Sequence, residues 1–341
     1  MGFWSKTAAS PSLWLASGFA TLNPGFLRPE SIPLPVPNTG DTIRRLTGSD
    51  SHIVATFWQK YYSGSDWELD ESVHVWVHRY LQDPNVFAFG LLNPDGLLAT
   101  IVSTPLGPTT MSHGASLRST RVIEGLCVHD SCRGKGVAGF MIEYIDAYTS
   151  IVCGPVALFW SRELNAKPFV STAISVDTYA YTRCELCPSR LRVNPVEWTV
   201  FQQLWTSNTS SWPGKCIIAT APVSRRDGLI VLEAQNHIVV VSRTGRRTKP
   251  DKLPIWEVVW CGLRFDTILT PGNCTEDVLT SVAAYLKTGL LFGSSSPIGG
   301  GVTRDWKAWH YGRSGVHAWY IYNYVPPAFG SCIFHAIRDE I

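Results

Sequence analysis

Charged side chains are scarce in this 341-residue chain, and no basic stripe runs along it. Lys, Arg, Asp and Glu together make up 16% of the residues, and 29 basic against 27 acidic side chains leave a net charge of +2. A protein that binds nucleic acid needs a basic face, so we do not expect a nucleic-acid partner. One basic cluster stands out, and we interpret it as a solvated hairpin tip: Arg243, Arg246, Arg247, Lys249 and Lys252.

Long apolar runs and a secretion leader are also lacking. The longest apolar stretches, such as Val86–Leu92, are far shorter than the roughly 20 residues that span a bilayer. Nine cysteines are spread along the chain, and Cys184 and Cys187 form a lone C-x-x-C without a second pair at zinc spacing. We therefore expect no transmembrane segment, no metal and a reducing compartment, the cytosol.

Apolar and aromatic residues are abundant. Hydrophobic residues make up 45% of the chain and aromatic residues 12%, with 14 tryptophans. This composition is typical of a globular protein with a large core, and the length favours two domains of roughly 150 residues each. Residues 1–40 are rich in Pro, Gly and Ser and are expected to form an extended arm, followed by domains over residues 41–187 and 188–341.

Periodicity predicts the elements of the first domain. Helical spacing predicts helices over residues 53–61, 72–81 and 137–148, the first capped by Ser49 or Asp50. Strand patterns are found over residues 86–92, 97–103, 122–128 and 156–160. An N-P-D-G turn joins the first two strands as a hairpin. The order strand, turn, helix, strand thus closes this domain.

The second domain repeats this order of elements with different residues. Helices are predicted over residues 196–205 and 276–286. Strands are predicted over residues 228–234, 237–242, 256–264 and 318–324. The two halves therefore look like a structural duplication, although no residue-level repeat is visible.

The strongest local signal is Arg133–Ala138, which fits R-x-x-G-x-A between a predicted strand and a predicted helix. Glycines allow positive φ and a close ligand approach, and the amides and dipole of a helix start favour an anion such as a pyrophosphate. Arg133 and Lys135 add positive charge. The alternative is an ordinary turn with solvated basic side chains. No G-K-S/T is present, so the stretch is not a P-loop.

The turn resembles the coenzyme A motif of the GNAT acetyltransferase superfamily, in which the preceding strand splays from its neighbour to accept the thioester. More specifically, residues 126–138 are similar to the L-C-V-H-x-x-x-R-x-K-x-V-A signature of eukaryotic N-myristoyltransferases. Gly315 with residues 319–324 resembles that family's C-terminal motif G-N-L-Q-Y-Y-L-Y-N-W. Phe3-Trp4 and Lys167-Pro168 match shorter family motifs. Identity between these stretches is thin, as in a strongly divergent member such as one encoded by a large virus.

The resemblance implies an α/β (α+β) fold of two tandem GNAT-like halves, each a mixed twisted sheet flanked by helices. The first half would bind myristoyl-CoA, and the second would form most of the groove for a peptide that begins with glycine. The implied partners are acyl-CoA and such peptides, and we expect a monomer. The residues implied to contact the coenzyme are Phe3, Trp4, Leu126, Cys127, Val128, Arg133, Gly134, Lys135, Gly136, Val137 and Ala138.

The resemblance also implies catalytic and peptide-binding residues. The backbone amides of Gly125 and Leu126 would form the oxyanion hole for the thioester carbonyl. The base that accepts a proton from the attacking amine would be the Ile341 terminal carboxylate, with Glu124 in reserve. The peptide would meet Tyr320, Tyr322 and Asn323 in the C-terminal motif, and an acidic stretch containing Asp66, Glu68, Asp70 and Glu71 could attract a basic peptide residue.

Three functions remain open. Glycylpeptide N-myristoyl transfer is the leading hypothesis. A GNAT that transfers a shorter acyl group to small amines or lysine is the second. The third is a non-catalytic lipid- or peptide-binding relative, because the family's R-Y-W-H-R block is replaced by residues 173–177 and its T-A-G by residues 160–162.

Overall fold

The computed structural model describes most of the chain, and side chains are discussed only where burial is assigned. The described residues are 25–26, 33–62, 67–106, 109–111, 116–117, 120–154, 157–163, 173–182, 190–208, 216–219, 228–249, 252–271, 274–288, 290–294, 309–310, 316–322, 324–325 and 333–335. Within these ranges no helix is long and apolar enough to cross a membrane.

The first half contains a mixed sheet whose central strands form an antiparallel meander. Its last strand runs parallel to β8 and follows it through helix α4 (Val137–Cys153). The strands, in spatial order, are β2 (Thr42–Arg45), β4 (Phe87–Asn93), β5 (Gly96–Pro105), β8 (Thr120–Val128) and β9 (Ala157–Glu163).

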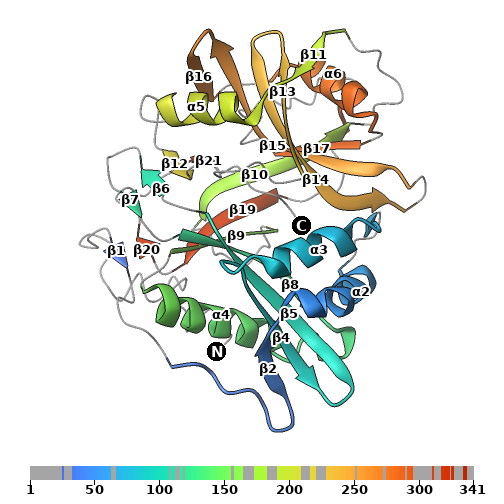
Figure 1. Ribbon diagram of the computed structural model, residues 1–341, viewed down its shortest axis with the longest axis vertical. Helices are drawn as coiled ribbons and strands as arrows, with labels where there is room; N and C mark the ends of the chain where they lie inside the picture. Colours follow the sequence, from blue (N-terminus) through green and yellow to red (C-terminus); the bar gives the residue numbers. More distant parts are fainter. Residues whose placement is uncertain are drawn as a thin grey trace.

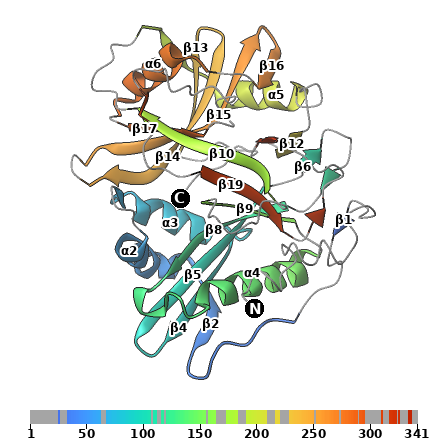
Figure 2. The ribbon, with the colours of Figure 1, turned by 180° about the vertical axis from the view of Figure 1, so that it is seen from behind.

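Helices cover both faces of this sheet. Helix α4 lies on one face, where Met141 and Ile145 are fully buried against Phe89 and Ile101. Helices α2 (Ser51–Tyr61) and α3 (Val73–Gln82) lie on the other face. The two opposite views show this three-layer arrangement in the lower part of the molecule (Figures 1 and 2).

The second half repeats this topology. Three antiparallel strands are followed by helix α6 and a parallel strand, and helices α5 and α6 pack on opposite faces. The elements are β11 (Val193–Pro195), α5 (Trp198–Asn208), β13 (Leu229–Ala234), β14 (His237–Thr248), β15 (Pro254–Phe265), β16 (Ile268–Pro271), α6 (Glu276–Leu286) and β17 (Leu290–Ser294). The predicted fold class, two tandem mixed α/β halves, is confirmed.

The two halves exchange strands across the predicted boundary. Strand β10 (Ala173–Thr182), which precedes the second half in the chain, pairs with β17 of that half. Strand β19 (Val316–Tyr322), near the end of the chain, pairs with β9 of the first half, and β10 and β19 pair with each other. Within the described residues, one continuous 15-stranded sheet therefore joins the two halves, and β10 and β19 lie at its centre in both views (Figures 1 and 2).

Several short elements complete the description. They are β1 (Gly25–Phe26), η2 (Gly48–Asp50), β3 (Trp67–Leu69), β6 (Thr109–Met111), β7 (Ser116–Leu117), η3 (Asp130–Cys132), β12 (Cys216–Ala219), β18 (Trp309–His310), β20 (Tyr324–Val325) and β21 (Ile333–His335). The five helices α2 to α6 were all predicted within a few residues, whereas β10 and these short strands were not.

The structure pairs Cys261 of β15 with Cys274, just before α6, as a disulfide. Both side chains are buried in the core beneath α6. No disulfide was predicted from the sequence. The predicted C-x-x-C at residues 184–187 lies outside the described residues.

Candidate functional site

Strand β8 carries a bulge at the position predicted for the oxyanion hole. Cys127 pairs with Thr100 of β5 and Glu124 pairs with Val102, so the register shifts between these two pairs. Two residues of β8 therefore stand opposite one residue of β5, and the first of them, Gly125, has φ of +56°. A bulge of this kind removes part of the strand from the regular ladder and redirects its peptide groups.

Only glycine fits at this bulge, for two physical reasons. Residues with a side chain rarely adopt a φ of +56°. A Cβ at Gly125 would also lie 2.7 Å from the indole ring of Trp58 and 3.0 Å from Val102.

Strand β8 separates from its parallel neighbour just before the bulge. Only Thr120–Val122 pair with β9, opposite Ala157–Phe159, although β8 continues to Val128. From Ile123 onward β8 pairs on its β5 side alone in the described residues. This is the splay that the sequence resemblance predicted.

A glycine turn connects β8 to α4. Gly134 and Gly136 have φ of +76° and +83°, and a Cβ at either position would meet no atom within 4 Å. Gly136 is the N-cap of α4 and provides no side-chain cap, and the first turn of the helix contains no acidic residue. The amides at this helix start therefore combine open space with the positive end of the helix dipole, which suits an anion.

The two cations of the turn have different environments. The Arg133 guanidinium donates to the carbonyl oxygens of Val128 at 3.2 Å and Tyr61 at 2.9 Å, and it forms an ion pair with Asp130 at 3.1 Å. It therefore braces the turn against the end of α2. The Lys135 side chain is exposed and has no hydrogen bond or ion pair with the other described residues, so its charge is directed to solvent.

The second half has a related strand pair but a blocked helix start. Val258 is the last residue of β15 that pairs with the parallel strand β17, and Val259 forms a bulge opposite β14. Helix α6, however, is capped by Thr275, whose hydroxyl accepts from the Val278 amide at 3.3 Å. Its first turn contains two carboxylates, Glu276 and Asp277, which repel an anion. Of these two helix starts, that of α4 is open and uncapped and that of α6 is not.

Glu124 lies beside the bulge and faces helix α3. The Tyr80 hydroxyl donates a hydrogen bond to Glu124 Oε2. Glu124 is half-buried. A carboxylate thus lies one residue before the predicted oxyanion pair, held by a side chain from a different layer.

Comparison with solved structures identifies the fold. N-myristoyltransferase from Saccharomyces cerevisiae with bound myristoyl-CoA matches with a TM-score of 0.67 at 11% sequence identity, covering 90% of each chain. A second structure of the yeast enzyme, also with myristoyl-CoA, matches with a TM-score of 0.65 at 12% identity, covering 90% of this chain and 86% of the other. This chain has the N-myristoyltransferase fold. The resemblance inferred from two short motifs is therefore confirmed at the level of the fold.

The sequence alone gives no such match. No protein-family model and no curated protein matches the sequence. Identities of 11% and 12% establish the architecture and leave the reaction to be argued from the site.

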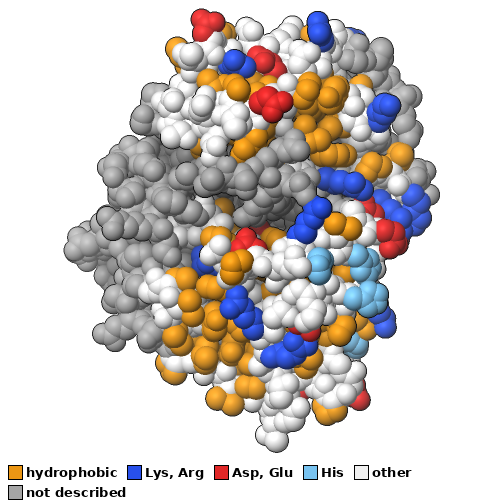
Figure 3. Space-filling view, viewed as in Figure 1, with side chains coloured by type: hydrophobic (Ala, Val, Ile, Leu, Met, Phe, Trp, Pro, Cys, Tyr) orange, Lys and Arg blue, Asp and Glu red, His pale blue; other side chains and the backbone are white. Residues whose placement is uncertain are grey.

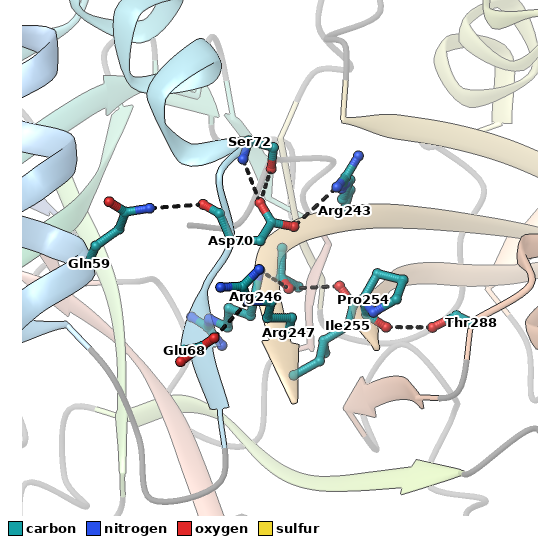
Figure 4. A network of polar contacts seen from close by, with 11 residues as sticks. Gln59, Glu68, Asp70, Ser72, Arg243, Arg246, Arg247, Pro254, Ile255 and Thr288 are labelled. Carbon is teal, nitrogen blue, oxygen red and sulfur yellow. Dashed lines mark hydrogen bonds and ion pairs between the residues drawn. The ribbon is translucent and has the colours of Figure 1, made fainter. Parts of the chain in front are cut away.

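The acidic stretch has partners other than those predicted from the N-myristoyltransferase resemblance. Glu68 Oε1 lies 2.7 Å from Arg247 Nε, and Asp70 Oδ2 accepts from Arg243 at 3.1 Å (Figure 4). Lys252 Nζ also lies 2.7 Å from Glu68 Oε1. Arg and Lys side chains gather beside acidic ones around the β14–β15 hairpin (Figure 3). The basic cluster, interpreted as a solvated hairpin tip, is instead ion-paired to the first half at these three positions.

Backbone pairing reinforces this contact between the halves. Strand β3 pairs with the end of β14, with Leu69 opposite Arg246 and Trp67 opposite Thr248. The Arg246 guanidinium also lies over the Trp67 ring, 4.6 Å from its centroid. Because Glu68 lies within this strand and neutralises two cations, the structure gives it a role in joining the halves.

Two further predicted residues lie in the strand that joins the sheet of the first half. Tyr320 and Tyr322 belong to β19, where their backbones pair with Trp160 and Leu158 of β9. The other predicted residues lie outside the described part of the chain: Phe3, Trp4, Asp66, Asn323 and Ile341.

Sequence reasoning missed two residues beside the bulge. Thr100 and Trp58 lie in the layer between β5 and α2, and both are almost fully buried. Each looks like an ordinary core position in the sequence, because nothing in a strand threonine or a helical tryptophan indicates a polar contact. Only the folded arrangement brings them to Gly125.

Proposed function

We propose that this chain is a glycylpeptide N-myristoyltransferase, which transfers a tetradecanoyl group from myristoyl-CoA to the N-terminal glycine amine of a protein. The observation that carries the proposal is the bulge at Gly125, which lies where β8 leaves β9 and leads directly into an uncapped glycine turn. The yeast enzyme that shares the fold was solved with bound myristoyl-CoA, which supports the choice of acyl donor.

In this proposal the turn holds the diphosphate of the coenzyme. The backbone amides of Gly134 and of residues 136–138 would face the phosphates, because those of Arg133 and Lys135 already donate to the carbonyls of Asp130 and Cys132. The exposed Lys135 side chain adds charge. Arg133 maintains the shape of the turn through its bonds to two carbonyls. By the family resemblance, Leu126, Cys127 and Val128 would lie along the pantetheine path, and Phe3 and Trp4 would contact the coenzyme.

The reaction is a direct acyl transfer. The glycine amine attacks the thioester carbonyl carbon and forms a tetrahedral intermediate, whose oxyanion accepts hydrogen bonds from the amides of Gly125 and Leu126. The intermediate collapses with cleavage of the C–S bond, so that coenzyme A leaves as a thiolate and the peptide retains the new amide. The amine must lose a proton, because an α-amino group has a pKa of about 7.7 to 8.0 in water.

Two carboxylates can accept that proton. The Ile341 terminal carboxylate is the leading candidate, by analogy with the family, and Glu124 is the alternative because it lies one residue from the oxyanion pair. Amidation of the terminal carboxylate by semisynthesis, compared with Glu124→Gln, separates them. The variant that lacks the base should have a much lower kcat that no longer rises with pH. The other variant should keep both the kcat and the pH dependence of the unaltered protein.

The acceptor peptide approaches along the second half. Tyr320, Tyr322 and Asn323 would contact its first residues, and Asp66 would meet a basic residue further along. The support for this assignment is the sequence resemblance of the C-terminal motif and the position of β19 beside β9.

The decisive experiment combines binding and transfer. Calorimetry with myristoyl-CoA and acetyl-CoA should show much tighter binding of the long chain, and mass spectrometry should show a mass increase on a Gly-initiated peptide but not on the same peptide with an N-acetylated glycine. The variant Lys135→Glu should weaken binding about tenfold at low salt and less at high salt, with Lys60→Glu, an exposed change on α2, as the control.

Two outcomes would overturn the assignment. Equal binding of acetyl-CoA and myristoyl-CoA with acylation of lysine or small amines identifies a short-chain GNAT. Tight binding of myristoyl-CoA with no transfer to any amine identifies a non-catalytic lipid-binding relative.

A further inference from the structure

We propose that Thr100 and Trp58 are positioning residues for acyl transfer, because they hold the peptide between Gly125 and Leu126 with its N–H directed at the thioester oxygen. This inference rests on the proposed function and adds two residues to it. Neither touches the reacting atoms, and both act through the orientation of one backbone peptide.

A chain of two buried hydrogen bonds fixes that orientation. Trp58 Nε1 donates to Thr100 Oγ1 at 2.7 Å, and Thr100 Oγ1 donates to the Gly125 carbonyl oxygen at 2.8 Å. The direction of both bonds is unambiguous, because an indole N–H only donates and a carbonyl only accepts. Thr100 is 0% exposed and Trp58 1% exposed, so water does not compete for these groups and the bonds are retained.

The same bonds determine where the Leu126 amide points. The C=O of Gly125 and the N–H of Leu126 belong to one peptide unit, and the described chain contains no cis peptide bond. In a trans peptide these two groups point in opposite directions. The Leu126 N–H is therefore directed away from Thr100, and at this position β8 has already left β9.

A bulged glycine needs such a restraint. Glycine has access to a wide range of φ and ψ, and a bulge residue lacks the ladder that fixes its neighbours. We call the two hydrogen bonds from Trp58 to Thr100 and from Thr100 to Gly125 the relay. Without the relay the peptide could rotate, and its carbonyl oxygen, which is the negative end of the peptide dipole, would then face the developing oxyanion. Trp58 opposes this rotation in two ways. Its indole N–H holds Thr100 by a hydrogen bond, and its ring lies 2.7 Å from the position that a Cβ of Gly125 would occupy. A hydrogen-bond donor that is already oriented before the reaction does not have to reorganise while the oxyanion forms.

The second half provides an internal comparison. Its bulge is formed by Val259, which is not among the described residues with positive φ. The neighbouring positions of β14 are Val239, Val240 and Val241, none of which has a hydroxyl. The relay and the turned glycine therefore occur together, in the half that carries the open helix start.

The test replaces Thr100 by Val, which keeps the shape and removes the hydroxyl. Thr100→Ser retains the hydroxyl and serves as the rescue. Thr104→Val makes the same chemical change on the same strand, four residues from Thr100 and also buried, and serves as the control. Each variant is first checked for cooperative thermal unfolding. If Thr100→Val does not fold, Trp58→Phe removes the indole donor instead.

The expected result separates binding from chemistry. In Thr100→Val, kcat for transfer should fall about 10- to 100-fold, part of the 10²- to 10³-fold effect of losing an oxyanion donor, while KM and the calorimetric Kd for myristoyl-CoA stay within about twofold. Thr100→Ser should recover most of kcat, and Thr104→Val should match the unaltered protein. Infrared spectra of bound myristoyl-CoA with a ¹³C-labelled thioester carbonyl should show a lowered stretching frequency, and Thr100→Val should return it toward the solution value.

Two results would overturn the relay without touching the proposed function. One is an unaltered kcat and carbonyl frequency in a folded Thr100→Val protein, and the other is an equal loss in Thr104→Val. Failure of the proposed function is distinct, because the unaltered protein would then neither bind myristoyl-CoA nor transfer the acyl group.

Discussion

At the scale of single residues, Gly125 and Gly136 share positive φ but differ in their surroundings. A Cβ at Gly136 meets nothing within 4 Å, so Gly136→Ala should cost only the backbone strain of about 1 to 2 kcal/mol. A Cβ at Gly125 meets Trp58 at 2.7 Å, so Gly125→Ala adds about 1 to 3 kcal/mol of overpacking. Urea unfolding of the two variants should show this order, and an equal loss would mean that Trp58 moves aside without cost.

A second residue-scale prediction concerns Cys127, two residues beyond the bulge. Burial raises the pKa of this thiol to about 12, so at pH 8 only about one molecule in 10⁴ carries the thiolate. We expect iodoacetamide to label the partly exposed Cys132 and to leave Cys127 unmodified in the native protein. We also expect no acyl-cysteine intermediate by intact-mass spectrometry during turnover. Labelling of Cys127 before Cys132 would contradict the buried placement.

At the scale of residues, the sequence indicated where the turn glycines lie but not which partners the charged side chains bind. The pattern R-x-x-G-x-A pointed to Gly134 and Gly136 as turn glycines, and both have positive φ, whereas Gly125 was assigned only through the family resemblance. The engagement of Arg133 with two carbonyls and of Glu68 with two cations was not, since a charged residue in a sequence does not reveal its partner.

At the scale of elements, the short helix η2, which leads into α2, depends on a buried carboxylate in its capping box. Asp50 receives two hydrogen bonds from Arg44, at 2.7 and 3.0 Å, and one from the Thr47 amide at 2.9 Å. The hydrogen bonds from Arg44, the largest cause, lower the pKa of Asp50 in the folded protein. A lowered folded pKa stabilises the fold above the unfolded value of about 3.9, and this stability is lost as the pH falls through the folded value.

We therefore expect Asp50→Asn to destabilise the protein at pH 7 by about 1 kcal/mol, as for a lost cap, and to flatten the decline of stability below about pH 4. The measurement is the urea midpoint as a function of pH. Asp95→Asn, in the exposed turn between β4 and β5, should leave the profile unchanged. An acid profile unaffected by Asp50→Asn would show that other carboxylates control it.

Helices were predicted more completely than strands for a physical reason. The apolar stripe of α4 from Val137 to Tyr148 is a local property, because a helix makes its hydrogen bonds within itself. Strand β10 was not predicted although it is 10 residues long. Its partners, β17 and β19, lie more than 100 residues away in the chain, and no local pattern specifies them.

At the scale of the whole molecule, the exchange of β10 and β19 makes the halves interdependent. In the sheet, β10 lies between β17 and β19, and β19 lies between β10 and β9. A fragment of residues 41–187 lacks both β17 and β19, so β9 loses one neighbour and β10 loses both. Exposed strand edges of this kind favour aggregation. We expect fragments 1–187 and 188–341 to be insoluble when expressed alone and to copurify as a folded pair when coexpressed.

Circular dichroism and size-exclusion chromatography would check this expectation. A soluble fragment 1–187 with cooperative unfolding would contradict it, and would instead support two autonomous domains that meet at residue 187. The ion pairs of Glu68 and Asp70 with the β14–β15 hairpin should help the coexpressed halves to associate, and high salt should weaken that contribution.

The sequence by itself determined the helices, the glycine turn and the duplicated order of elements, because each depends on residues within a few positions of one another. It also indicated the N-myristoyltransferase fold through two short motifs. Only the tertiary structure decided which strands pair across the halves, which helix start remains open, and which buried side chains orient the bulge at Gly125. These features join residues as distant as Trp58, Thr100 and Gly125, and their energies arise only when folding excludes water from between them.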